Sequence, residues 1–238
     1  MSRRHILGLL VIIAAVTFVL SDRAQPPATD TDARIAFYQA RLGGRGTYPA
    51  YARLGIAYLQ KARETADPTY LAKAEENLQA SMAFQRNFEA LRALAFLAME
   101  KHEFQAALEY ANEAHDTIPS DLETKGILSD VYWALGDRSR AVRLVQEMLA
   151  SEENFAGLSR FAVIRFAEGD TEGAVESMQR ACVHAVKESR PLDNRAWCYN
   201  RLGTYLGAMG DTSAAKEAYR HAVAYVPGYP YALRELEN

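Results

Sequence analysis

Three Gly-Asp pairs at nearly regular intervals constrain the fold of this chain more than any other feature. Gly136-Asp137 and Gly169-Asp170 are 33 residues apart, and Gly210-Asp211 follows after 41 residues, which is 34 plus an insertion of seven. Each pair ends one apolar helical pattern and begins another, and an Ala follows each Gly after five residues. Self-similarity near 34 residues with helical spacing predicts stacked pairs of helices. We expect each Gly to end a helix with a positive φ and the polar residue after it to cap the next helix.

Further residues in the same register resemble the tetratricopeptide repeat family. That family has a small residue at repeat position 8, aromatics at 11 and 24, Ala at 20 and 27, and Pro at 32. Positions 8, 20, 24, 27 and 32 of the last repeat are Gly203, Ala215, Tyr219, Ala222 and Pro227. Earlier repeats match at Ala95, Ala107, Ala114 and Pro119, at Ser129, Tyr132 and Ala141, and at Ala162, Ala174 and Ala181. The first repeat opens with Gly55 and Tyr58 and carries a seven-residue insertion around residues 64–70. The third departs from the pattern, with Met148 at position 27 and Glu153 at position 32.

The resemblance implies an all-α fold, a right-handed superhelical solenoid of stacked antiparallel helix pairs. We expect a signal peptide or membrane anchor at 1–21, a linker at 22–30 and the solenoid at 31–238. Within the solenoid we expect a half-repeat at 31–46, repeats at about 48–86, 88–121, 122–154, 155–188 and 196–229, and a short C-terminal helix at 230–238.

The N-terminal segment predicts export or membrane attachment. Arg3, Arg4 and His5 precede the apolar run 6–20. Its residues would rise about 22 Å as a helix, less than the roughly 30 Å hydrocarbon core. This fits a secretory signal peptide, cleaved after Ser21, or an uncleaved anchor. In both cases the positive-inside rule places the remainder outside the cytoplasm, which is the periplasm in a bacterium.

The sequence offers little for catalysis. The five His residues lack the spacing of metal ligands, no nucleophile-base arrangement is visible, and carboxylates follow helix-surface spacing. We therefore predict a protein that is not an enzyme and has no cofactor or metal. The net charge of −3 gives no basic field that would favour nucleic acid.

Cys182 and Cys198 are the two cysteines of the chain. They fall on helices that we expect to pack together. Outside the cytoplasm they could form a disulfide, and two buried free thiols are the alternative.

The resemblance also implies a binding surface. In this family, positions 2, 5, 9, 12 and 13 of each first helix face the concave side and usually meet the ligand. Those positions, with two arginines that border them, give the candidate partner-binding residues Arg92, Phe96, Met99, Asp130, Trp133, Arg160, Val163, Phe166, Trp197, Asn200 and Arg201. An aromatic groove edged with Arg suits an extended or helical peptide. Packing between repeats is the alternative for the aromatic residues, above all for Phe96 and Phe166.

These expectations favour a scaffold or adaptor that binds a protein or peptide partner outside the cytoplasm, in the assembly of an envelope complex. The alternative is a homo-oligomeric structural element. It rests on the C-terminal stretch 230–238, which restarts a first helix for only about two turns. A short cap can leave part of the last repeat's apolar face open to a second copy.

Overall fold

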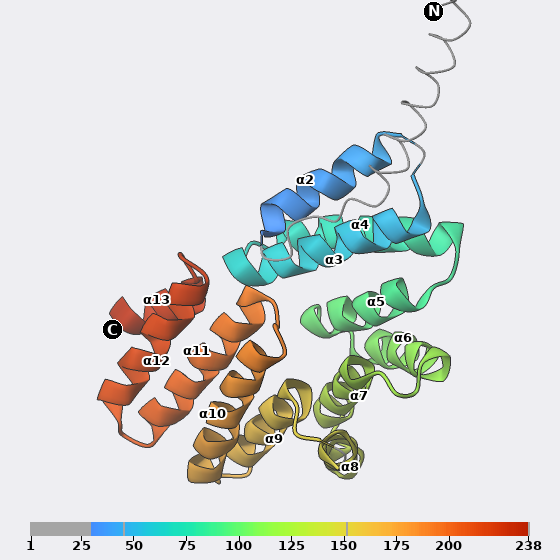
Figure 1. Cartoon of the computed structure of the whole chain (residues 1–238). Helices are drawn as coiled ribbons and strands as arrows, with labels where there is room; N and C mark the ends of the chain where they lie inside the picture. The colour runs from blue at the N-terminus through green and yellow to red at the C-terminus, as the bar shows by residue number, and fades with distance from the viewer. Residues whose placement is uncertain (1–29, 45, 151, 238) are drawn as a thin grey trace, which may run out of the picture.

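The computed structural model describes residues 30–44, 46–150 and 152–237, and within these ranges all regular structure is helical (Figure 1). The apolar run 6–20 and residues 22–29 of the expected linker lie outside the described residues. Among the described residues, none of the helices is both long and apolar enough to span a bilayer.

The helices follow one another as stacked pairs joined by short turns. In chain order they are α2 (Thr31–Leu42), α3 (Tyr48–Thr65), α4 (Thr69–Phe84), α5 (Phe88–Glu100), α6 (Phe104–Thr117), α7 (Leu122–Ala134), α8 (Arg138–Leu149), α9 (Phe155–Ala167), α10 (Thr171–Lys187), α11 (Leu192–Ala208), α12 (Thr212–Tyr225) and α13 (Pro230–Glu237). The pairs are α3 with α4, α5 with α6, α7 with α8, α9 with α10, and α11 with α12. Before them α2 packs on α3, and after them α13 packs on α12.

The Gly-Asp pairs form the turns inside three of these repeats. The φ angles at Gly136, Gly169 and Gly210 are +86°, +91° and +87°, which L side chains rarely adopt. In the last of these turns, the Asp211 carboxylate accepts a hydrogen bond of 2.9 Å from the Ala214 N–H and so caps α12. The Asp residues of the other two pairs cap α8 and α10 in the same way. The predicted turn chemistry is therefore confirmed.

The small residues at positions 8 and 20 lie where the two helices of a pair cross. Ala107, Ala141 and Ala174 are fully buried. A Cβ added to Gly203 would lie 2.5 Å from Cε1 of Tyr219, so the aromatic ring of the second helix occupies the space that glycine leaves. Packing at interior density leaves no room for a larger side chain there.

The last repeat begins earlier than the family register indicates. Helix α11 starts at Leu192, four residues before the expected start at 196. Pro191, with extended ψ, stands at the N-cap and directly precedes the helix. Much of the inserted sequence between repeats four and five thus lengthens α11 to 17 residues instead of forming a loop.

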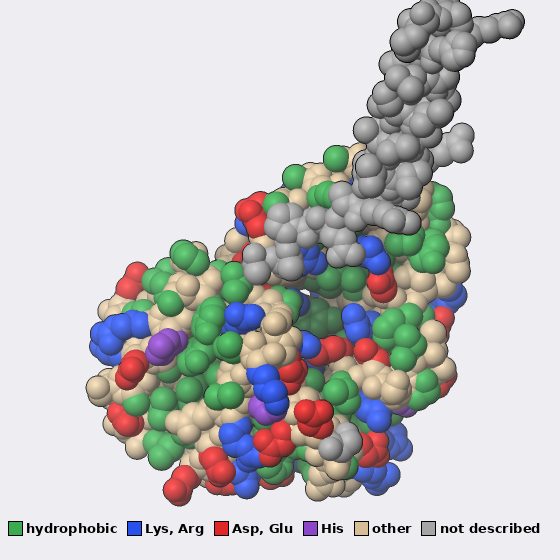
Figure 2. Space-filling model, in the orientation of Figure 1, with side chains coloured by type: hydrophobic (Ala, Val, Ile, Leu, Met, Phe, Trp, Pro, Cys, Tyr) green, Lys and Arg blue, Asp and Glu red, His purple; other side chains and the backbone are tan. Residues whose placement is uncertain are grey.

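The stacked pairs curve until the first repeat meets the last (Figure 1). Helix α11 touches α3 directly, and Arg63 of α3 forms an ion pair with Asp193 of α11. The five first helices α3, α5, α7, α9 and α11 surround a hollow, visible near the centre of Figure 2. We call their inward side the concave face.

Helix α13 covers the end of the last repeat. Its Ala232 is fully buried, and Leu236 packs against the cluster formed with Tyr219 and Ala222. Among the large apolar side chains described in α12 and α13, only Tyr231, at 41%, is exposed.

Candidate functional site: the concave face

A pocket opens on the concave face between α7 and α9. Its volume is about 100 Å³. The lining residues are Ser129, Asp130 and Trp133 from α7, and Arg160, Val163 and Ile164 from α9. Four of these six are candidate partner-binding residues. We call this site the α7–α9 pocket.

An ion pair fixes the polar wall of the α7–α9 pocket. The Arg160 guanidinium donates to both carboxylate oxygens of Asp130, with Nη2 2.8 Å from Oδ2 and Nε 3.1 Å from Oδ1. Arg160 Nη1 also donates to the Ala156 carbonyl at 3.1 Å. The surrounding protein raises the pKa of Asp130 by burial, against the attraction of Arg160, although 41% of the Asp130 side chain is exposed to solvent. The paired groups line the pocket with fixed hydrogen-bonding geometry, while the side chains of Trp133 and Val163 supply apolar surface.

Gly126 on α7 makes room for this arrangement. The guanidinium of Arg160 lies against the Gly126 Cα, and a Cβ there would overlap it. The family register does not single out this glycine, because the group that requires it belongs to the next repeat. It is a site residue that the sequence analysis missed.

Four of the other candidates pack between repeats. Arg92 Nη1 lies 3.0 Å from Oδ1 of Asp121 and so joins α5 to the N-cap of α7. Phe96 is partly buried beneath the Arg63 guanidinium, whose Cζ is 4.9 Å from the ring centroid. Met99 packs into the core between the second and third repeats. The ring of Phe166 stacks on that of Tyr205, with centroids 4.3 Å apart.

The pKa of Asp121 follows from this packing. Burial raises it, but hydrogen bonds from the Thr124 side chain and backbone, together with the charge of Arg92, outweigh burial and lower the pKa below its usual value. The carboxylate is therefore held ionised where α5 and α7 meet.

The three candidates on α11 form a separate group. Trp197 meets the Phe155 ring edge to face at 6.4 Å, and the guanidinium of the exposed Arg201 lies 5.8 Å from the Trp197 ring centroid. The side-chain oxygen of Asn200 is buried and has no hydrogen-bond partner. The concave face therefore does not bring all eleven candidates into one groove.

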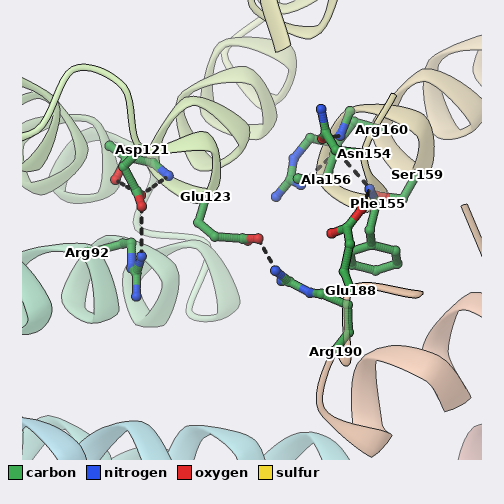
Figure 3. A network of polar contacts seen from close by, with 12 residues as sticks. Arg92, Asp121, Glu123, Asn154, Phe155, Ala156, Ser159, Arg160, Glu188 and Arg190 are labelled. Atoms are coloured by element: carbon green, nitrogen blue, oxygen red, sulfur yellow. Dashed lines mark hydrogen bonds and ion pairs between the residues drawn. The ribbon is translucent and has the colours of Figure 1, made fainter. Parts of the chain in front are cut away.

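A second ion-pair network crosses the concave face and was missed by the sequence analysis. Figure 3 shows Glu123 of α7 reaching Arg190 in the turn between α10 and α11, with Oε1 and Nη2 2.6 Å apart. The Arg190 guanidinium lies over the Phe155 ring at 5.0 Å. Glu188 accepts a hydrogen bond of 2.8 Å from the Phe155 backbone N–H, at the start of α9. Charged residues spaced this irregularly carry no helical signal, so only the insertion marks the region in the sequence.

The two cysteines meet between α10 and α11. The structure joins Cys182 and Cys198 in a disulfide, with Cα atoms 5.6 Å apart, a separation that suits such a bond. Both side chains are buried. In the described part of the chain, no cluster of His, Cys, Asp and Glu is arranged to hold a metal ion.

Comparison with known proteins identifies the repeat. The sequence profile described as the tetratricopeptide repeat matches residues 198–227, which form most of α11 and α12. The same helix arrangement occurs in solved structures of such repeats. Residues 198–227 form a tetratricopeptide repeat, and the described helices have the fold of solved tetratricopeptide-repeat structures. No curated protein matches this chain in sequence.

Three solved structures are similar to it. TTC0263, a thermophilic tetratricopeptide-repeat protein of Thermus thermophilus, superposes with a TM-score of 0.62 at 17% identity, over 80% of this chain and 98% of that one. A chain of the Cut9–Hcn1 hetero-tetramer of the APC/C superposes with a TM-score of 0.62 at 15% identity, over 87% of this chain and 46% of that one. Human IFIT1, a dimer with PPP-AAAA, superposes with a TM-score of 0.63 at 14% identity, over 87% of this chain and 49% of that one. This chain spans less than half of the last two chains, and at these identities the likeness establishes the fold alone.

Proposed function

We propose that this protein is a non-catalytic scaffold that binds a segment of a protein partner on its concave face, anchored in the α7–α9 pocket. The observation that carries the proposal is the pocket itself. It gathers Asp130, Trp133, Arg160 and Val163 on two neighbouring first helices, which are the helices that line the concave face of such solenoids.

The size and lining of the α7–α9 pocket favour a peptide side chain over a small-molecule ligand. Pockets for drug-sized ligands usually measure 300–1,000 Å³, whereas this one measures about 100 Å³. The surface of Trp133 and Val163 can contact an apolar side chain of the partner. The Asp130–Arg160 pair beside it can exchange hydrogen bonds with the partner's backbone, and Trp and Arg are frequent binding anchors.

We further propose that the scaffold acts outside the cytoplasm, in the assembly of an envelope complex. Two observations support this location. The sequence begins with a basic stretch and an apolar run typical of export. The pairing of Cys182 with Cys198 suits an oxidising compartment, because disulfides are rare in the cytosol.

A crosslinking pull-down from intact cells tests the binding proposal, with the full-length chain as bait. We compare the unmodified bait with Trp133→Ala and with Val183→Ala. Val183 is a matched control because it lies on α10 and is 65% exposed. We expect one dominant partner with the unmodified and Val183→Ala baits. Removing a central aromatic anchor typically costs 2 kcal/mol or more, so Trp133→Ala should lower recovery by a factor of about thirty.

Equal recovery with all three baits would refute the proposal, provided that circular dichroism shows Trp133→Ala to be folded. Recovery of self-crosslinked chains alone would favour the homo-oligomeric alternative.

A further inference from the structure

The two seven-residue insertions of the repeat pattern lie at the place where the array closes. The first, residues 64–70, begins directly after Arg63. The second, residues 189–195 between repeats four and five, contains Asp193. The end of α3 and the start of α11 are thus the elements that depart from the 34-residue register, and they are the elements that touch each other.

An ion pair joins α3 to α11. Arg63 Nε lies 2.7 Å from Oδ2 of Asp193, although the two residues are 130 positions apart. The Asp193 side chain is 1% exposed. Phe96 packs beneath the guanidinium of Arg63 and holds it in place. We call Arg63 and Asp193 the clasp.

Tyr229 adds a buried neighbour to the clasp. It is 2% exposed, and burial, followed by the charges of Tyr231 and Asp193, raises its pKa. The phenol therefore stays neutral. The segment that precedes α13 thus lies close to the point where α3 and α11 meet.

The second insertion is tied to other repeats on the same side. Arg190 binds Glu123 of the third repeat, and Glu188 just before it binds the start of α9 (Figure 3). Arg195 Nε donates to the Arg190 carbonyl at 2.9 Å and holds the turn together. This turn positions Asp193 for Arg63 independently of any ligand.

The clasp is poised to open. The other oxygen of Asp193, Oδ1, is buried without a hydrogen-bond partner, and an unsatisfied buried acceptor is costly. The Asp193 carboxylate regains water when α3 and α11 part, while the Arg63 side chain is already 34% exposed. An ion pair of this kind therefore favours closure only weakly. Among the described helices, α3 and α11 make the main direct contact between the first and last repeats. The rest of the connection runs through the repeats between them, which a solenoid can flex.

We propose that Arg63 and Asp193 close the concave face into a ring and that a partner reaches the α7–α9 pocket only when this clasp opens. The second half of this statement rests on the proposed function, and the first half does not. The kind of ligand that this implies is a partner segment too bulky to pass through the closed ring.

A distance measurement tests the clasp without any partner. Spin labels are placed on the outer helices of the first and last repeats through Glu76→Cys and Glu217→Cys, both exposed positions. The structure pairs the native cysteines, and a parent without the two new cysteines checks that they take up no label. Double electron–electron resonance should give one narrow distance distribution in the labelled parent. Asp193→Asn and Arg63→Met should each shift it to longer distances.

Circular dichroism of each variant separates loss of the ion pair from misfolding. Lys61→Met is the matched control, because Lys61 on the same helix pairs with Asp32 of α2 and does not join the two ends. An unchanged distribution in both Asp193→Asn and Arg63→Met, in folded proteins, would overturn the clasp.

A size-selective reaction tests whether the clasp controls access. Val163→Cys places a thiol in the α7–α9 pocket, and its rates with N-ethylmaleimide and with a polyethylene glycol maleimide are compared. A minor open state is typically 0.1–10% populated, so Asp193→Asn should speed the bulky reagent about tenfold or more and leave the small one unchanged. A rate with the bulky reagent that does not rise would overturn access control. Neither result depends on the Trp133→Ala pull-down, so the two proposals fail separately.

Discussion

At the scale of single residues, glycines set how closely the helices approach. The glycine at Gly203 could be predicted, because the family register assigns a small residue to position 8. Gly126 could not, since the group that fills its space, Arg160, comes from the following repeat. The repeat register predicts which residues must be small because of contacts inside one repeat. It does not predict which must be small because of contacts with the next repeat.

Gly203→Ala tests the crossing of α11 and α12. A Cβ at this position meets the buried Tyr219 ring, and overpacking costs about 1–3 kcal/mol. We expect the free energy of unfolding in urea to fall, by somewhat less than this because alanine favours the helix. Gly207→Ala is the matched control on α11, where the nearest atom to the new Cβ would be the Ala215 Cβ at 3.9 Å. There we expect a gain of about 0.5–1 kcal/mol. A lower free energy of unfolding in both variants would contradict the explanation by overpacking against Tyr219.

Asp121→Asn tests the ion pair between α5 and α7. The pKa of Asp121 is lowered in the folded protein, so its contribution to stability is present above the unfolded pKa, about 3.9. This contribution is lost as the pH falls through the lower folded value. Asparagine keeps the N-cap of α7 but loses the charge that Arg92 meets. We expect the variant to lose about 1 kcal/mol near pH 7.

Unfolding in urea between pH 7 and pH 2 measures this effect. The difference in free energy of unfolding between the parent and Asp121→Asn should shrink below pH 4. A difference that stays constant down to pH 2 would show that the charge of Asp121 does not contribute to stability.

At the scale of elements, the helix pairs and the turns between them could be predicted from the sequence. The places that the inserted residues take in the structure could not. The Gly-Asp pairs locate the turns because their chemistry is local, a positive φ followed by a capping carboxylate. The insertions break the same register, but the sequence pattern does not indicate whether the inserted residues form helix or loop. Helix α11 absorbs several of them and begins at Leu192, directly after Pro191.

The link between α10 and α11 gives a prediction at this scale. Alkylation of the denatured protein without reductant should modify neither Cys182 nor Cys198, as read by intact mass. Reduction of the bond should lower the free energy of unfolding by about 3 kcal/mol, the value for a loop of about 15 residues. A double Cys182→Ala, Cys198→Ala variant should show no further loss on reduction. Free thiols in protein from the native compartment would instead support the alternative of two buried cysteines.

At the scale of the whole molecule, an all-helical solenoid could be predicted, whereas closure could not. Curvature is the sum of small rotations between neighbouring repeats, and each depends on side chains from two repeats. The candidate site shows the same limit. Asp130, Trp133, Arg160 and Val163 share the α7–α9 pocket, but Arg92 and Phe166 are engaged by residues that the register could not assign to them.

The C-terminal end of the array is the surface on which the homo-oligomeric alternative rests. A stable interface usually buries 1,200–2,000 Å², and among the large apolar side chains described in α12 and α13 only Tyr231 is exposed. We therefore expect a monomer by size-exclusion chromatography with light scattering, at a mass that does not change with concentration. Tyr231→Ser should behave in the same way. A dimer that Tyr231→Ser dissociates would favour the homo-oligomeric alternative and place its interface on α13. A dimer that persists in Tyr231→Ser would place the interface elsewhere on the molecule.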